Sequence, residues 1–238
     1  MKIAKFLLSV IVFLNLIPLL YILFIGFNSV DLHKIFSLTY NSFLLAIVSV
    51  IMSFIFAIPS AFIFTCRKSY YKYFVIVILL TISILPPFLI SIMLTNLFYY
   101  LKINNGFISL SFAHMILVFP YTLALMILGF SFFPKSAIYA SRLYATNFIK
   151  GFIMFYFPFI KNTFLVAFVL GVSISMSQYI ITLMLNNPSF STLMLEIIPY
   201  LKSADLKSAN TYGIVFIANS AFAIYILYRL KNVLFKNQ

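Results

Sequence analysis

Few side chains in this sequence could take part in chemistry, and none has the spacing that a catalytic site would need. The three acidic residues form no pair, there is no Gly-rich phosphate loop, and no Ser or Cys stands beside a base. The histidines His33 and His114 and the single cysteine, Cys66, have no metal-ligand spacing, and one cysteine excludes an internal disulfide. The sequence therefore predicts a protein that is not an enzyme and that holds no metal or cofactor.

The polar residues inside the long apolar stretches are the remaining candidates for function. Ser173, Ser175 and Ser177 alternate at two-residue spacing, which on a helix places them on more than one face. Gln178 follows them directly. Such groups either line a path for a polar solute or form hydrogen bonds between helices, and we favour the second reading. For His114 a satisfied packing role is favoured over a proton relay, because no acid accompanies it.

The composition is that of an integral membrane protein. Of the 238 residues, 64% are hydrophobic and 8% are charged, and the mean hydropathy is +1.14. Apolar surface on this scale exceeds what one soluble core can bury. The net charge of +13 comes from basic residues at the ends of apolar segments, where they set topology and meet anionic lipid. Membrane lipid is therefore an expected partner, and nucleic acid is not.

Charges and turn residues divide the chain into six apolar stretches, each close to the roughly 20 residues that cross a hydrocarbon core of about 30 Å. The first follows two lysines as a signal peptide would, but it continues to Phe27 without a small-residue cleavage site, so we interpret it as a retained span. The sequence predicts an all-α membrane bundle with six transmembrane helices. Residues 1–30 would hold the tail and the first span, and residues 31–238 a five-helix core. The stretches are 6–27, 40–65, 73–98, 108–130, 159–185 and 211–228.

The basic residues predict the orientation of these spans. Twelve of the 16 Lys and Arg lie in the N-terminal tail, in 66–72, in 134–161 and at the C-terminus. The other four, and all three acidic residues, lie on the opposite side. Because cytoplasmic loops carry an excess of Lys and Arg, both termini are predicted to be cytoplasmic, while 28–39 and 186–210 face outward.

Two further features interrupt the apolar pattern. Pro86 and Pro87 stand near the middle of the third stretch, where their missing N–H groups predict a kink. Within the outer segment 186–210, residues 191–201 are amphipathic but too short to cross the bilayer, so we expect them at the membrane interface or dipping into it.

Residues 134–158, PKSAIYASRLYATNFIKGFIMFYFP, form the only long polar interruption in the middle of the chain. They carry basic residues and no acid, which is typical of a cytoplasmic loop. Ser141 and Ala145 lie one helical turn apart, and Tyr144, Phe148 and Phe152 recur every four residues. A short helix here would carry an aromatic stripe beside a groove where another backbone could approach.

This loop resembles the cytoplasmic loop of permease subunits of ATP-binding-cassette importers. The family pattern is Glu-Ala-Ala, three residues, Gly, nine residues, an aliphatic residue, one residue and Leu-Pro. Tyr139 stands in place of the Glu and Ala145 in place of the Gly, so the polar contact that the Glu makes with the ATPase is not expected here. The register holds without a gap at Tyr139, Ala140, Ser141, Ala145, Phe155, Phe157 and Pro158.

The flanking sequence extends this resemblance from about Tyr40 to the last span. Ala113-His114 followed by Pro120-Tyr121 resembles the family's fourth span. Further on, Ser177-Gln178-Tyr179 and Thr182-Leu183 stand where many members have Gly-Glu-Phe and Thr-Leu. In the family, the helix that here contains Pro86 and Pro87 borders the translocation route.

The resemblance implies a multi-pass permease subunit of the bacterial inner membrane that forms half of a translocation pore. Its partners would be a second copy or a sister permease, an ATPase subunit and a solute-binding protein, and the matching stretches lean toward the thiamine, ferric-iron, oxyanion and polyamine branch. The residues implied in coupling to the ATPase are Tyr139, Ala140, Ser141, Arg142, Tyr144, Ala145, Phe148 and Pro158. Those implied on the translocation path are Pro86, Pro87, His114, Ser175 and Gln178.

Two other function classes stay open. An ion-coupled carrier or channel is one, although proton- and sodium-coupled carriers ordinarily keep an acid within a span and no apolar stretch here contains one. A non-transporting membrane scaffold or assembly protein is the other, because the loop lacks the Glu and the Gly of the family pattern.

Overall fold

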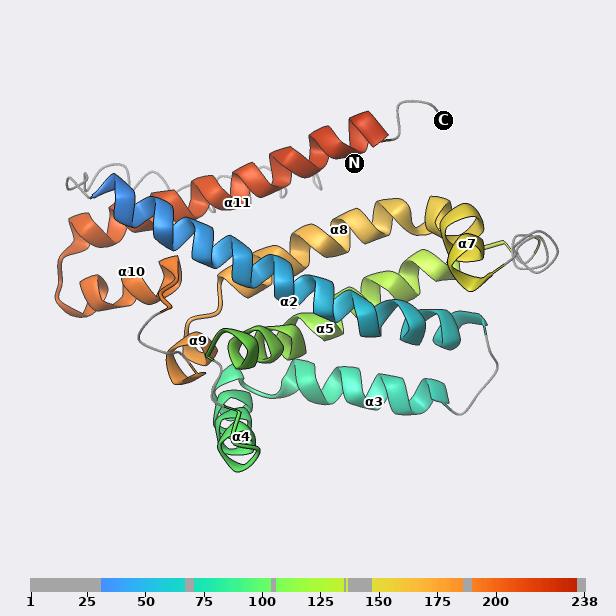
Figure 1. Cartoon of the computed structure of the whole chain (residues 1–238), viewed down its shortest axis with the longest axis horizontal. Coiled ribbons are helices and arrows are strands. Elements are labelled where there is room, and N and C mark those ends of the chain that lie inside the picture. The colour runs from blue at the N-terminus through green and yellow to red at the C-terminus, as the bar shows by residue number, and fades with distance from the viewer. Residues whose placement is uncertain are drawn as a thin grey trace, which may run out of the picture.

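The computed structural model of the chain describes residues 31–66, 71–103, 106–134, 136, 147–185 and 190–234. These residues form helices and connections with no strand among them, so the predicted all-α class is confirmed. Helices α2 (Leu32–Cys66), α3 (Tyr71–Ile84), α8 (Phe157–Met176) and α11 (Leu206–Leu234) run lengthwise through the molecule (Figure 1).

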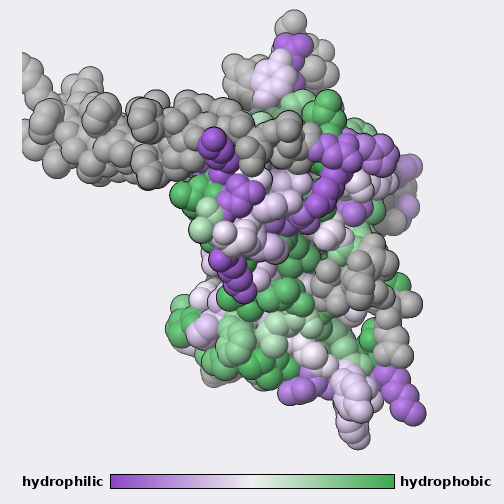
Figure 2. All heavy atoms as spheres, turned by 90° about the vertical axis from the view of Figure 1, so that its left-hand side faces the viewer, coloured by the Kyte–Doolittle hydropathy of each residue, from purple (hydrophilic) through white to green (hydrophobic). Residues whose placement is uncertain are grey.

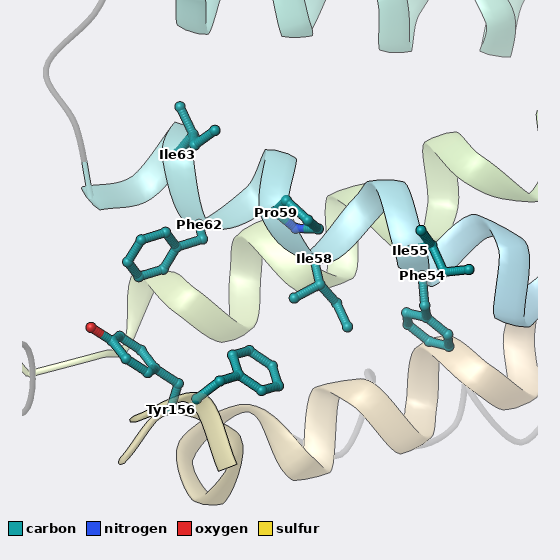
Figure 3. Close-up of a pocket in the computed structure, with 8 residues that line it drawn as sticks. Phe54, Ile55, Ile58, Pro59, Phe62, Ile63 and Tyr156 are labelled. Carbon is teal, nitrogen blue, oxygen red and sulfur yellow. The ribbon is translucent and has the colours of Figure 1, made fainter. Parts of the chain in front are cut away.

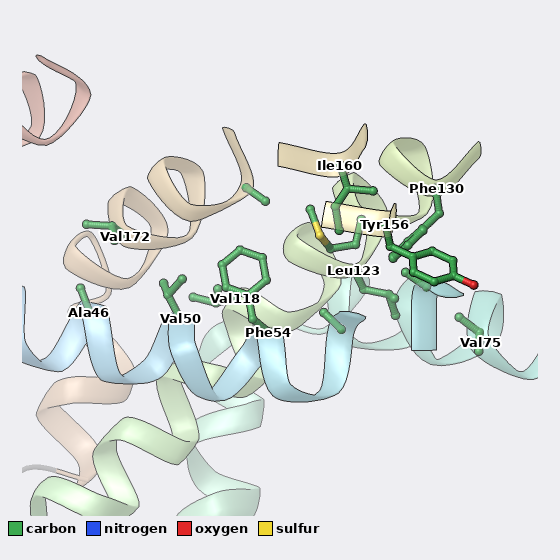
Figure 4. Close-up of a cluster of buried hydrophobic side chains, with 14 of the residues drawn as sticks. Ala46, Val50, Phe54, Val75, Val118, Leu123, Phe130, Tyr156, Ile160 and Val172 are labelled. Atoms are coloured by element: carbon green, nitrogen blue, oxygen red, sulfur yellow. The ribbon is translucent and has the colours of Figure 1, made fainter. Parts of the chain in front are cut away.

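The centre of the bundle is formed by α2, α5 (Gly106–Ser131) and α8. The buried face of α2 is rich in small side chains, among them Ala46, Ser49 and Ala57, which are fully buried. Small residues let neighbouring helix backbones approach closely. In lipid, the hydrophobic effect does not drive helices together, so close packing of this kind holds them in contact. Larger side chains fill the remaining space, as Figure 4 shows for Phe54, Leu123 and other residues of this cluster.

Two glycines show how close these helices come. A Cβ on Gly171 of α8 would lie 2.9 Å from Cγ2 of Val50 on α2 and 3.0 Å from Cγ1 of Val118 on α5. A Cβ on Gly129 of α5 would lie 2.3 Å from Oγ1 of Thr163 on α8. A side chain at either position would require neighbouring side chains or helices to shift, so glycine fits the close packing here.

The third apolar stretch is broken where a kink was expected. Helix α3 ends at Ile84, and α4 (Pro87–Tyr100) begins after Pro86 at an angle of 105° to it. Pro86 has the extended backbone (φ −59°, ψ 137°) that a residue before proline favours, and Pro87 occupies the first turn of α4. Because neither proline can donate a helical N–H bond, the two in sequence end one helix and start another. The expectation of one span over 73–98 is therefore wrong as a continuous helix.

The fifth stretch is also interrupted. Helix α8 ends at Met176, Ser177–Tyr179 are not helical, and a short helix α9 (Ile180–Leu185) follows. The side chain of Ser177 donates to the carbonyl of Ile174 at 2.8 Å, one of the local bonds by which serine competes with helical geometry. The fifth apolar stretch is thus a segment long enough to span, which ends at Met176, followed by a short helix. On its N-terminal side, α8 follows α7 (Phe148–Gly151) and a π-helical turn, η1 (Phe152–Tyr156).

A helix, α10 (Leu193–Lys202), lies where the sequence predicted a short amphipathic element. Two contacts tie it to α2: Lys34 forms an ion pair with Glu196, and the N–H of Leu193 donates to Oγ of Ser42 at 2.9 Å. The turn into α11 places Ala204 at φ 60°. Asp205 then caps α11, since its Oδ1 accepts the N–H of Ser208 at 3.2 Å, and the hydrogen bonds from Ser208 lower the pKa of this carboxyl.

Within the described residues, three helical segments are long and apolar enough to cross a membrane: Leu32–Thr65, Gly106–Ser131 and Phe152–Met176. The bent pair α3 and α4 makes a fourth candidate if it counts as one span. Helix α11 covers the sixth predicted stretch but is not among these candidates, and the first predicted stretch lies outside the described residues. The architecture is that of a helical bundle compatible with a membrane.

Candidate functional site

A buried histidine joins three helices near one end of the bundle. His114 lies in the N-terminal third of α5 with 1% of its surface exposed. Its Nδ1 lies 2.8 Å from Oγ of Ser175 on α8, and its Nε2 lies 3.0 Å from Oγ1 of Thr182 on α9. Ser175 and Thr182 are themselves buried. One imidazole therefore holds both sides of the break in the fifth stretch.

The hydrogen bonds determine which nitrogen carries the proton. Oγ1 of Thr182 donates to the carbonyl of Gln178, so it can only accept from the ring. Nε2 is then the donor in a neutral imidazole, and Nδ1 accepts the hydroxyl proton of Ser175. Every polar atom of this His114 junction, defined as His114, Ser175 and Thr182, is satisfied by uncharged partners. These contacts are the helix–helix hydrogen bonds that the sequence analysis favours; a role on a path stays a prediction.

The break in the third stretch lies close to the same junction. Ile90, Leu94 and Phe98 of α4 form a buried cluster with Ala113 and Leu117 of α5 and with Ile181 of α9, and Leu85 at the break packs against it. Ala113 precedes His114 and Ile181 precedes Thr182, so this cluster adjoins the junction directly. Pro86 and Pro87 themselves are exposed. The structure thus gathers both breaks and the histidine at one end of the bundle.

Gln178 and Thr182 differ from what the sequence suggested. The backbone carbonyl of Gln178 takes part in the junction, and its side chain is only half-buried. Thr182 supplies the buried side chain, although the only sequence feature that pointed to it was the match of Thr182-Leu183 to the family pattern. The signal that could have identified it is its place four residues after Gln178 in an apolar run, where a threonine hydroxyl reaches back to a carbonyl.

Ser173 and Ser177 lie on the outer side of α8, away from the junction. With Val166, Val169, Leu170 and Ile174 they line an open groove of about 590 Å³. Ser177 is exposed, whereas Ser175 between the two is buried. The prediction that the alternating serines fall on different faces is confirmed.

A second polar pair joins α2 to α5 in the middle of the bundle. Oγ of Ser53 lies 2.5 Å from Oγ1 of Thr122, and both residues are fully buried. Thr122 also donates to the carbonyl of Phe119 at 3.0 Å, which leaves Ser53 to donate to Thr122. This pair is closed off from solvent and serves packing between the helices.

The opposite end of the bundle carries an apolar pocket of about 420 Å³ (Figure 3) between α2 and η1. Tyr156 of η1 forms one wall and packs edge-on against Phe62, with ring centroids 5.2 Å apart. The same ring stacks on Phe133, just beyond α5, at 4.8 Å. The lining residues are Phe54, Ile55, Ile58, Pro59, Phe62, Ile63, Phe152 and Tyr156.

Of the residues predicted to couple to an ATPase, the structure describes two, Phe148 and Pro158. Phe148 begins α7, and Pro158 lies half-buried in the first turn of α8. The stacking of Phe133 on Tyr156 brings the two ends of the predicted loop together. The remaining candidates lie outside the described residues: Tyr139, Ala140, Ser141, Arg142, Tyr144 and Ala145.

No family model matches the chain, and no curated protein matches it at a significant level.

Proposed function

We propose that this chain is the transmembrane permease subunit of an ATP-driven importer and forms half of the path for a small polar solute. A solute-binding protein delivers the solute, and ATP is hydrolysed on a separate subunit. The second half of the path is another copy of this chain or a sister permease. The substrate class leans toward that of the thiamine, ferric-iron, oxyanion and polyamine permeases, and the location is the bacterial inner membrane.

The observation that carries the proposal is the gap-free register of the family's loop pattern over Tyr139–Pro158. The fold supports it through the place of the loop, which connects α5 to α8, two helices that pack closely along the bundle. Motion of the loop would reach both helices at once, since Phe133 and Tyr156 stack where the loop leaves and rejoins them.

The arrangement of the ends supports the predicted orientation. The start of α2, the helix α10 and the start of α11 lie toward one end in Figure 1, joined by the contacts of Lys34 with Glu196 and of Asn41 with the carbonyl of Ser191. The end of α2, the helix α7 and the far end of α11 point toward the other. If residues 6–27 form the first span that the sequence predicts, this alternation would correspond to six spans with both termini in the cytoplasm.

The polar groups inside the described spans are also those expected of a transporter that is not driven by an ion gradient. The described spans contain no acidic residue, and the His114 junction is built from uncharged groups. Energy for uphill transport would then come through the loop.

Replacing Ala145 by Trp tests this proposal. A bulky side chain on the docking surface should weaken co-purification of the ATPase and abolish solute-stimulated ATP hydrolysis, while membrane insertion stays normal. The matched control is Ala221→Trp, the same change on an exposed position of α11. Full transport by the Ala145→Trp protein, with its ATPase still bound, would reject the coupling role and favour a scaffold.

A further inference from the structure

Helix α4 runs in a different direction from the long helices of the bundle. It turns by 105° from α3, and Figure 1 shows it strongly foreshortened while α2, α3 and α8 run across the view. Its 14 residues correspond to a length of about 21 Å. If the long helices cross a membrane, α4 lies close to the membrane plane.

One face of α4 is fixed to the bundle. Ile90, Leu94 and Phe98 are spaced one turn apart and are each 6% exposed. They pack on Ala113 of α5 and Ile181 of α9. The direction of α4 is therefore set by a packed apolar contact as well as by the prolines.

A neighbouring face of α4, about 100° around the helix from the buried one, is exposed and mainly apolar, with the exposed Asn96 beside it. Leu89, Met93 and Leu97 lie along it and are 45%, 63% and 45% exposed. No charged residue occurs in the helix, whose sequence is PFLISIMLTNLFYY. In water this face would cost roughly 25 cal/mol for each Å² of apolar surface left exposed.

The C-terminal end of α4 has a different character. Tyr99 and Tyr100 are each 86% exposed, and the exposed Lys102 follows in the turn. Tyrosine is enriched at membrane–water interfaces, where the ring meets acyl chains and the hydroxyl meets water, and lysine reaches lipid phosphate groups from the same level.

The end of the molecule that carries α4 is divided into two areas. In Figure 2, hydrophilic side chains gather in the upper part, where α10 and the starts of α2 and α11 lie, and hydrophobic side chains are more frequent below them, with a few hydrophilic ones at the lowest edge. An end facing only water would have no reason to keep the lower area apolar.

We propose that α4 is an interfacial helix that lies in the membrane plane and binds the lipid surface. Leu89, Met93 and Leu97 contact acyl chains, while Tyr99, Tyr100 and Lys102 contact phospholipid headgroups. Helix α3 alone is about 21 Å long, which is shorter than a hydrocarbon core of about 30 Å. Helix α4, which follows it, therefore lies near one surface of that core and at its boundary with the headgroups. The proposal concerns lipid contact only and does not depend on transport.

Single tryptophans test the orientation, because the chain has no natural tryptophan. Leu89→Trp and Leu97→Trp are separately introduced into the full chain, which is reconstituted in vesicles of phosphatidylcholine and phosphatidylglycerol. Quenching by lipids brominated at different acyl positions then gives the depth of each probe. The two positions lie about 12 Å apart along the helix axis. For a helix in the plane, both probes are quenched most by the same position near the headgroup, and their depths differ by less than half of that distance.

A matched pair on α3 provides the control. Ile76 and Ile84 are exposed and have the same eight-residue spacing. Because α3 runs with the long helices, Ile76→Trp and Ile84→Trp should be quenched best by bromines at clearly different depths. If the α4 pair differs in depth as much as the α3 pair, α4 spans the bilayer and the proposal is wrong. It is equally wrong if lipid quenches neither α4 probe, since water or a second copy of the chain then covers this face.

A second variant with a smaller substitution tests the proposal even if a tryptophan variant fails to fold. Met93→Cys in a Cys66→Ser background carries a nitroxide label. The label should be more accessible to oxygen, which dissolves in lipid, than to a water-soluble nickel chelate. The reverse order would overturn the proposal.

Discussion

His114 and Thr182 are joined by a hydrogen bond of 3.0 Å that ties α5 to α9. Together with the bond from Ser175 to the other ring nitrogen, it spans the non-helical segment Ser177–Tyr179. The angle between α8 and α9 is therefore held by a side chain from a third helix, and not by the continuous backbone of one.

Removing the imidazole should loosen this connection. His114→Ala leaves the buried hydroxyl of Ser175 without its ring partner and opens a cavity, so we expect a loss of about 1–3 kcal/mol in the free energy of unfolding. Thermal unfolding in detergent measures it. The control His33→Ala removes an exposed imidazole and should leave the transition unchanged. Equal transitions for both variants would contradict a structural role for the junction.

The two glycines Gly171 and Gly213 should respond in opposite ways to the same change. Gly171→Ala places a methyl group 2.9 Å from Val50 and 3.0 Å from Val118, so it should destabilise the bundle by about 1–3 kcal/mol. Gly213→Ala meets nothing within 4 Å and should be neutral or stabilising by up to about 1 kcal/mol. Adding Val50→Ala to Gly171→Ala should recover part of the loss. A stabilised Gly171→Ala protein would show that α2, α5 and α8 pack more loosely than described.

The two ties between α10 and α2 should differ in strength. Ser42→Ala leaves the buried N–H of Leu193 without a partner, which should cost about 1–3 kcal/mol. Glu196→Gln removes a partly exposed ion pair with Lys34 and should cost at most about 1 kcal/mol, less in high salt. Chemical denaturation at low and high salt compares them. A larger effect for Glu196→Gln would mean that charge pairing, and not the buried bond, holds α10.

Cysteine labelling checks the orientation. In a variant lacking Cys66, a single cysteine at Ser203 should react with an impermeant reagent in intact cells, because the twelve-to-four division of basic residues predicts that 186–210 faces outward. A cysteine at Ser141 should react only after the membrane is opened. Labelling of a cysteine at Ser141 in intact cells would contradict the predicted topology. It would also remove the basis for a contact between this loop and an ATPase.

The sequence by itself determined the helical, apolar character of this protein and the positions where its helices lose regularity. Hydropathy predicted the second and fourth apolar stretches, which α2 and α5 cover, because a long apolar run satisfies its own backbone only as a helix in lipid. Pro86 and Pro87 predicted a kink in the third stretch, because a missing N–H is a local property.

Only the tertiary structure decided the size of that kink and the partners of the polar residues. The 105° turn depends on Ile90, Leu94 and Phe98 finding their contacts on α5 and α9, which no local pattern specifies. In the same way, Ser175 and Gln178 were visible as polar residues in an apolar run. The hydrogen bonds of Ser175 to His114, and of His114 to Thr182, join positions 61 and 68 residues apart in the chain. Sequence spacing carries no information about such pairs, because they exist only once three helices have packed together.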